Sequence, residues 1–176
     1  MKDAVLVALA FLLLVVQATV ATIVPTHVIA PNLLLPIAIY LGVSHDVWIV
    51  RGALLSFVFG AFLDAFSGNP VLSLQTFAMV AVFVLSRFAG LRLFLRGPIF
   101  QIILTFVVTL LAGGTILALR TIFEKPAPFP VGTSSHTVLT LIAPALTTAI
   151  VAPLIFLTVR RVDSAVARRR DQERTA

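Results

Sequence analysis

The sequence predicts an all-α polytopic membrane protein, a bundle of six transmembrane helices with both termini in the cytoplasm. Hydrophobic residues make up 60% of the 176 residues and charged residues only 11%, too few charged groups to cover a water-soluble globule. Six apolar segments alternate with short polar turns, and the basic residues gather on one side of that alternation. The whole chain is therefore expected to be one membrane domain.

The first apolar segment, residues 4–24, has polar side chains only at Gln17, Thr19 and Thr22. About 21 residues at ~1.5 Å each are enough to cross a hydrocarbon core about 30 Å thick. A cleavable signal peptide is the alternative, but Ala18 and Ala21 are three apart where an A-x-A site needs a spacing of two. We therefore expect a first spanning helix.

The second segment, residues 28–43, contains Pro31 and Pro36 with Asn32 between them. Pro31 suits a first helical turn, whereas Pro36 removes a hydrogen-bond donor and is expected to kink or break the helix. Counted from Pro31, the helix is short for a bilayer. We therefore expect a broken or tilted span.

The third segment, residues 47–66, carries small or acidic residues four apart, a row that continues into the following turn: Gly52, Ser56, Gly60, Asp64 and Gly68. Such a row lies on one face of a helix, and small residues let a neighbouring helix come close in lipid. The row could be a packing seam only. Asp64 needs a further explanation, because a carboxylate at mid-bilayer costs roughly 2.5 to 3.5 kcal/mol. We expect this span to be the central helix of the bundle.

The fourth and fifth segments are residues 71–85 and 98–120, and the fourth follows a tight turn at residues 67–70. Arginines after the fourth segment are expected to reach anionic lipid headgroups: Arg87, Arg92 and Arg96. The fifth segment carries a second row in fours, a candidate packing partner for the glycine face of the third span: Gln101, Thr105, Thr109 and Gly113.

The sixth segment, residues 138–159, follows a connector at 124–137 with three prolines in five residues, which we expect to be extended and outside the bilayer. Pro144 and Pro153 lie inside the segment and predict kinks. The hydroxyls of Thr140, Thr147 and Thr148 are near enough to help satisfy the carbonyls that these prolines free. Residues 160–176 form a basic cytoplasmic tail.

Basic residues predict the orientation of the six spans. With the N-terminus inside, 11 of the 13 Lys and Arg residues lie on the cytoplasmic side, and only Arg120 and Lys125 lie outside. This bias agrees with the positive-inside rule. Asp64 and Arg120 then both lie near the outer boundary, so an ion pair between them is our named candidate. The alternatives for Asp64 are simple contact with water, capping of the turn at residues 67–70, or another hydrogen-bond donor such as Thr or Gln.

The sequence shows none of the constellations that membrane enzymes need. There is no cysteine, no HExxH or GxSxG spacing, and no pair of carboxylates placed for acid–base work. His27, His136 and Glu124 could meet at the outer face, but ordinary interfacial histidines explain them as well. We expect no catalytic residues, no metal site and no cofactor, and the net charge of +6 indicates lipid contact and topology rather than nucleic acid.

Residues 31–88 resemble the rod shape-determining protein MreD family. The resemblance rests on PNLLLPIAIYLGV, on RGALLSFVFGAFLDAFSG, and on a turn proline followed by an aliphatic helix that ends in arginines. Gly60, Asp64 and Gly68 match the family's G-x-x-x-D-x-x-x-G feature. The glycine that the family commonly has just after the turn proline is absent, since Val71, Leu72 and Ser73 stand there.

The resemblance implies a non-enzymatic subunit of the bacterial cell-elongation complex in the cytoplasmic (inner) membrane, acting in cell shape and peptidoglycan synthesis. Its expected partners are an MreC scaffold protein, MreB filaments, the RodA polymerase and a class B transpeptidase. The family is also similar in fold to the substrate-binding subunits of energy-coupling-factor transporters, so a small-molecule-binding transporter subunit is the alternative. An aromatic-lined pocket open to the outer side would favour that alternative.

Overall fold

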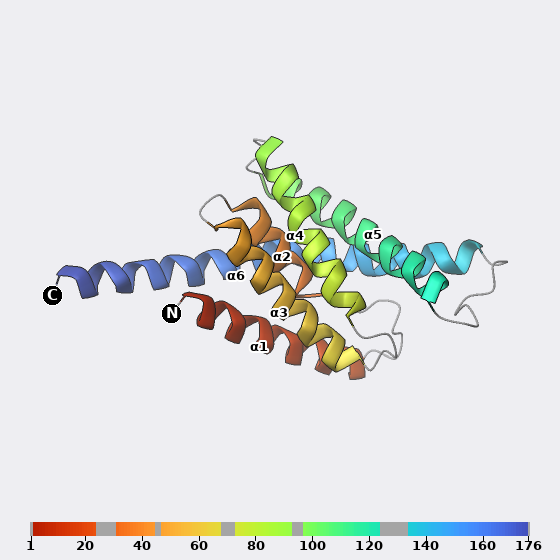
Figure 1. The fold of residues 1–176 in the computed structure, drawn as a ribbon, viewed down its shortest axis with the longest axis horizontal. Helices are drawn as coiled ribbons and strands as arrows, with labels where there is room; N and C mark the ends of the chain where they lie inside the picture. The colour runs from red at the N-terminus through yellow and green to blue at the C-terminus, as the bar shows by residue number, and fades with distance from the viewer. Residues whose placement is uncertain are drawn as a thin grey trace.

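The computed structural model describes residues 2–23, 31–44, 47–67, 73–92, 97–123 and 134–175. These residues form six helices and, within those ranges, no strand. The helices are α1 (Lys2–Ile23), α2 (Leu35–Val43), α3 (Ile49–Ser67), α4 (Leu74–Arg92), α5 (Pro98–Phe123) and α6 (Ser134–Thr175). Figure 1 shows an elongated bundle in which both chain termini lie toward the same end.

Four helices are long and apolar enough to cross a membrane: α1, α3, α5 and α6. The other two are shorter. The apolar stretch of α4 covers only Leu74–Gly90, and α2 has nine residues, about 13 Å of helix. The predicted all-α fold is confirmed for the described residues, and four of the six helices are long and apolar enough to span a membrane.

The most enclosed helix is α2. Seven of its nine residues are buried, and it packs against α3, α4, α5 and α6. A helix that is apolar on every side is stable only where every side is covered. By contrast, α3 exposes Ile49, Val50, Leu54, Phe57 and Phe66. The structure therefore places α2 at the centre of the bundle, and the prediction that the third span is the central helix is wrong.

Pro36 lies in the first turn of α2. A proline there loses no intrahelical hydrogen bond, because the first N–H groups of a helix have no partner within it. The expected break in the second segment is thus explained differently: Pro31–Leu34 is not helical, and the helix begins at Leu35. Residues 24–30, which include the predicted start of this segment, lie outside the described residues.

Two further boundaries differ from the predictions. The helix α4 continues beyond Leu85 to Arg92, so Arg87 belongs to the helix. The helix α6 begins at Ser134, within the predicted connector, and continues to Thr175. Figure 1 shows the end of α6 extending beyond the rest of the bundle. The predicted basic tail is therefore a continuation of the last helix.

Glycines bring α2 and α4 close together. A Cβ atom added at Gly42 would lie 2.7 Å from the Cβ of Ser86 and 2.8 Å from the carbonyl oxygen of Phe83. One added at Gly90 would lie 3.0 Å from the Cα of Val43. Because helices in lipid associate through close packing, these glycines hold the central helix against α4.

The second row of residues spaced four apart, on α5, packs against a different helix from the one predicted. Thr105 and Thr109 are buried, Gln101 is half-buried, and a Cβ atom added at Gly113 would lie 3.0 Å from a methyl carbon of Leu141 in α6. The helix α5 packs mainly on α6 and also on α4, with little or no contact with α3 among the described residues. The row is a packing face, but the glycine face of α3 has another partner.

Candidate functional site

The carboxylate of Asp64, near the end of α3, caps the start of α4. Its Oδ1 accepts a hydrogen bond from the backbone N–H of Gln75 at 3.0 Å, and its Oδ2 accepts one from the N–H of Thr76 at 2.9 Å and one from the Thr76 hydroxyl. The first N–H groups of a helix lack partners within it, and a negative charge there also complements the helix dipole. Asp64, a residue of α3, thus supplies the acceptors for two N–H groups in the first turn of α4.

Gly60 makes this cap possible. It lies four residues before Asp64, on the same face of α3, and is buried. A Cβ atom added at Gly60 would lie 2.4 Å from the Cα of Thr76 and 3.0 Å from its backbone nitrogen. The two backbones therefore approach closely at this point, which brings α4 within reach of the short aspartate side chain.

The rest of the α3 row also faces α4. A Cβ atom added at Gly52 would lie 2.4 Å from the ring of Phe83, and both Phe83 and Ser56 are fully buried. The predicted packing face of α3 is therefore a contact with α4 along most of its length. Gly68 lies outside the described residues.

Ser73, directly before α4, has a φ of 74°. This left-handed conformation favours glycine, because a Cβ atom there is crowded by the backbone. The chain nevertheless has a serine, with a Cβ atom, at this position. Its carbonyl accepts the N–H of Phe77 at 2.9 Å, so the strained residue forms part of the helix start.

The predicted ion pair between Asp64 and Arg120 stays a prediction. Arg120 lies in the last turn of α5 and is half-buried. For Asp64, the contacts described above correspond to the alternative of another hydrogen-bond donor, a threonine hydroxyl together with two backbone N–H groups.

A second capped helix start lies in the segment that leads into α2. Asn32 Oδ1 accepts hydrogen bonds from the N–H groups of Leu34 and Leu35 at 3.2 and 3.3 Å. Gln17 Oε1, from α1, accepts the N–H of Leu33 at 3.0 Å, and the hydroxyl oxygen of Thr148, from α6, accepts the N–H of Asn32 at 3.0 Å. Three separate parts of the chain thus meet here.

These contacts account for every backbone donor at the start of α2. After Asn32, Leu33, Leu34 and Leu35, the next residue is a proline without an N–H, and Ile37 and Ala38 both donate to the carbonyl of Leu34. A buried backbone donor without an acceptor is strongly unfavourable in an apolar environment. The polar residues of this segment therefore allow α2 to begin inside the bundle.

The sequence patterns did not predict this second cap. Asn32 is a residue type that favours helix starts, and Gln17 is a polar residue in an apolar helix, so both carried a signal. Thr148 was expected to help the carbonyls freed by proline, but its oxygen serves Asn32 instead. Thr147 donates to the carbonyls of Ala143 and Pro144, whereas the carbonyls that Pro144 and Pro153 free, four residues back, are those of Thr140 and Ala149.

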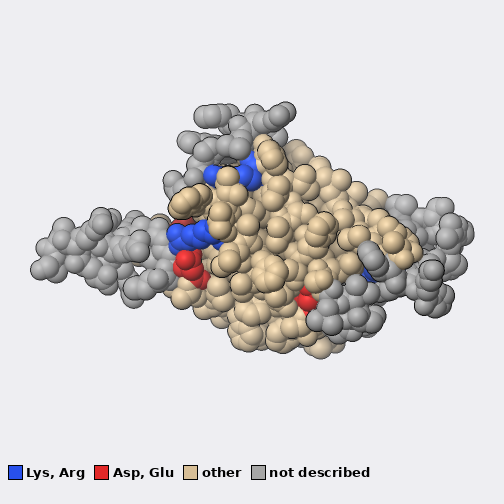
Figure 2. Space-filling model, viewed as in Figure 1, with Lys and Arg blue, Asp and Glu red and all other residues tan. Residues whose placement is uncertain are grey.

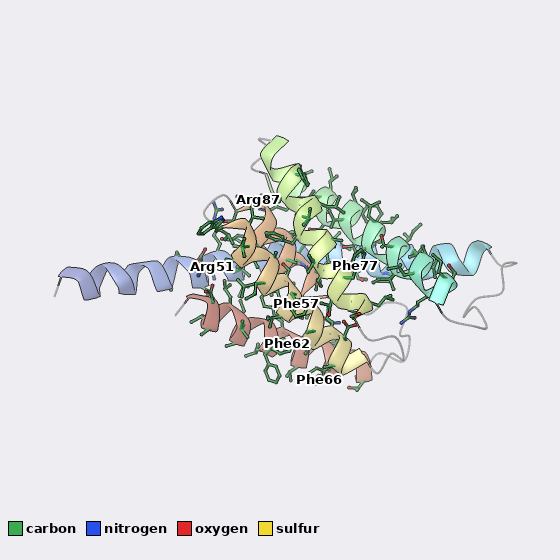
Figure 3. The ribbon with its side chains drawn as sticks, viewed as in Figure 1. Arg51, Phe57, Phe62, Phe66, Phe77 and Arg87 are labelled. Carbon is green, nitrogen blue, oxygen red and sulfur yellow. The ribbon has the colours of Figure 1, made fainter. Side chains whose placement is uncertain are left out.

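Two arginines make contacts near the end of the bundle where the termini lie (Figure 3). The exposed Arg51, at the start of α3, forms an ion pair with Asp3, at the start of α1, with Nε 2.8 Å from Oδ1. Nη1 of Arg87 donates to the carbonyl of Ser44, directly after α2, at 2.6 Å. Arg87 thus has an internal contact, and its predicted headgroup contact stays a prediction. The side chains of Arg92 and Arg96 lie outside the described residues.

Each carboxylate contact described above joins one helix to another. The described residues include no group of three or more His, Cys, Asp or Glu side chains that could hold a metal ion. No family model, curated protein or solved structure matches this chain.

Proposed function

We propose that this protein is a non-enzymatic, multi-pass subunit of the cell-elongation complex in the bacterial cytoplasmic membrane, where it binds an MreC-like scaffold. The proposal rests on the resemblance of residues 31–88 to the MreD family. The observation that supports it best is the Asp64 cap, because the aspartate of the resemblance motif holds two helices together with the help of Gly60. A carboxylate used in this way suits a binding subunit.

The proposal includes six crossings of the membrane with both termini in the cytoplasm, and bends in α6 at Pro144 and Pro153. The bias of basic residues supports this topology, as does the position of both termini toward one end of the bundle (Figure 1). In this arrangement, the short α2 completes its crossing together with the chain that precedes it. A reporter fused after Ala176 is expected to behave as cytoplasmic, and one inserted after Lys125 as periplasmic. Periplasmic activity after Ala176 would contradict the topology.

Partner binding is tested by purifying the tagged protein in mild detergent from cells that also produce the MreC-like scaffold. We expect the scaffold to be recovered with the wild-type protein and less of it with Asp64→Leu, which removes the cap between α3 and α4. Leu154→Ala is the control, since Leu154 is 69% exposed on α6. Wild-type protein that is folded but recovers no scaffold would overturn the proposal.

The transporter alternative predicts a polar pocket lined by aromatic residues. The single tryptophan, Trp48, is 78% exposed, and the ring of the single tyrosine, Tyr40, packs edge-on against Phe156 with centroids 5.9 Å apart. Neither position favours an aromatic-lined binding pocket. Recovery of a small molecule, in place of a scaffold protein, in the same purification would favour the transporter alternative.

A further inference from the structure

The guanidinium of Arg87 is only partly satisfied by the protein. Its Nη1 donates to the carbonyl of Ser44, whereas its Nε is buried without a hydrogen-bond partner. The side chain as a whole is half-buried. A cation withdrawn from water in this way is unfavourable unless an anion or further acceptors lie nearby.

The described carboxylates have other partners. Asp3 pairs with Arg51, Asp64 caps α4 at the end of that helix opposite to Arg87, and Asp163, on α6, has an interaction of its own. Among the described residues, no carboxylate forms an ion pair with Arg87. The positive charge between α2 and α4 is therefore left for a group from outside the described chain.

The position of Arg87 near the end of the apolar part of α4 suits a contact with lipid headgroups. It is three residues before Gly90, the end of the apolar stretch of α4, and the neighbouring Phe88 is 62% exposed. Figure 3 shows Arg87 toward the same end of the bundle as Arg51, and Figure 2 shows Lys and Arg side chains gathered near this end of the visible face. A lipid phosphate could reach the guanidinium here.

We propose that Arg87 forms a binding site for the phosphate group of an anionic phospholipid at the junction of α2 and α4. The guanidinium is planar and presents its donors as a fork, which suits phosphate oxygens. Nη1 of Arg87 is held by the carbonyl of Ser44. Nη2 then donates to the lipid phosphate. Binding there compensates the charge of Arg87 and joins the end of α2 to the lipid around α4.

The first test is lipid retention by native mass spectrometry, after purification from nanodiscs that contain equal parts of phosphatidylglycerol and phosphatidylcholine. Wild-type protein should retain phosphatidylglycerol preferentially, and Arg87→Gln should lower that preference by about fivefold, the factor expected for one basic residue at an anionic surface. Arg160→Gln is the matched control, because it removes one exposed positive charge where α6 leaves the bundle. Equal retention by Arg87→Gln and wild type, or an equal loss in both variants, would overturn the site.

A second measurement needs only the wild-type protein. A photoactivatable phosphatidylglycerol should label the peptide that contains Arg87 more strongly than the peptide that contains Arg160. Labelling without that preference would overturn the proposal, even if Arg87→Gln did not fold.

Two further experiments distinguish binding of a lipid phosphate from binding of another anion. Inorganic phosphate added to detergent-solubilised protein should stabilise it less than phosphatidylglycerol does, and equal stabilisation would assign the site to a free anion. Asp46, two residues after Ser44 in the sequence, is the internal rival. Asp46→Asn should leave phosphatidylglycerol retention unchanged, whereas a gain in this variant would show that Asp46 is the counter-ion of Arg87 in the wild-type protein and would contradict the lipid site. The inference holds independently of the cell-elongation proposal.

Discussion

At the starts of α2 and α4, backbone N–H groups have no acceptor within their own helix. Different side chains accept hydrogen bonds from these groups in the two helices. Gln17 and Asp64 each lie fifteen residues after the first residue of their helix, α1 or α3, and those two helices begin side by side, joined by Asp3 and Arg51. Both caps are therefore at similar depth, about 22 Å along the long helices. At α2 the caps are the neutral side chains of Gln17, Asn32 and Thr148; at α4 the cap is a carboxylate.

Burial explains this difference. Around the start of α2, Thr148 is 1% exposed and Leu34 is 0% exposed, so a charge would be far from water. Asp64 is half-buried and Ser73 is exposed, so the carboxylate keeps part of its hydration while it accepts three hydrogen bonds. A charged acceptor binds N–H groups more strongly, but only a neutral one can be buried fully at low cost.

The largest expected effect comes from Gly60→Leu, which forces α3 and α4 apart. Since even a Cβ atom at this position would meet the backbone of Thr76 at 2.4 Å, we expect a loss of about 3 kcal/mol or more in unfolding free energy. Unfolding by SDS titration in mixed micelles measures it. Gly114→Leu is the control, because a Cβ atom there meets nothing within 4 Å. Equal stability of the Gly60 variant and the wild type would show that the two helices do not pack closely.

Asp64→Leu should have the next largest effect, a loss of about 2 to 3 kcal/mol in unfolding free energy, because it leaves the partly buried N–H groups of Gln75 and Thr76 without an acceptor. Asp64→Asn keeps one acceptor oxygen and should lose less. The same SDS titration applies, with Asp3→Asn as the control for an exposed carboxylate, whose ion pair contributes at most about 1 kcal/mol. If Asp64→Leu were no worse than Asp3→Asn, the cap would not stabilise the fold.

Asn32→Ala tests the neutral cap. It removes the acceptor of two N–H groups at the start of α2, and we expect a loss of about 1 to 2 kcal/mol. Thr19→Val is the control, because the exposed hydroxyl of Thr19 binds only a carbonyl of its own helix, that of Val15. A loss larger than that of Asp64→Leu would reverse the ranking of the two caps.

The smallest expected effect is a gain. Ser73→Gly relieves the left-handed conformation at φ 74° and should raise the unfolding free energy by about 1 kcal/mol. Thermal unfolding in detergent can detect this shift. Ser73→Ala keeps the Cβ atom and should show no gain, so an equal change in both variants would mean that backbone strain is not the cause.

Much of the fold follows from local patterns in the sequence. Apolar length places α1, α3 and α5 within a few residues of their observed bounds, because hydropathy and helical rise depend only on neighbouring residues. The spacing of Gly52, Ser56 and Gly60 correctly indicates a buried face of α3, since residues four apart share one side of a helix. The need of Asp64 for a partner follows from the cost of a carboxylate in lipid.

Only the tertiary structure determines which helix packs against each of these faces and which helix start each polar side chain caps. The periodicity of α3 marks a face but does not name α4 as its partner, and the second row on α5 fits the same rule while packing elsewhere. The cap of α2 joins Asn32 to Thr148, 116 residues apart, and no local pattern connects them. Local sequence determines where helices form and which faces need cover, whereas the pairing of faces depends on how all six helices pack at once.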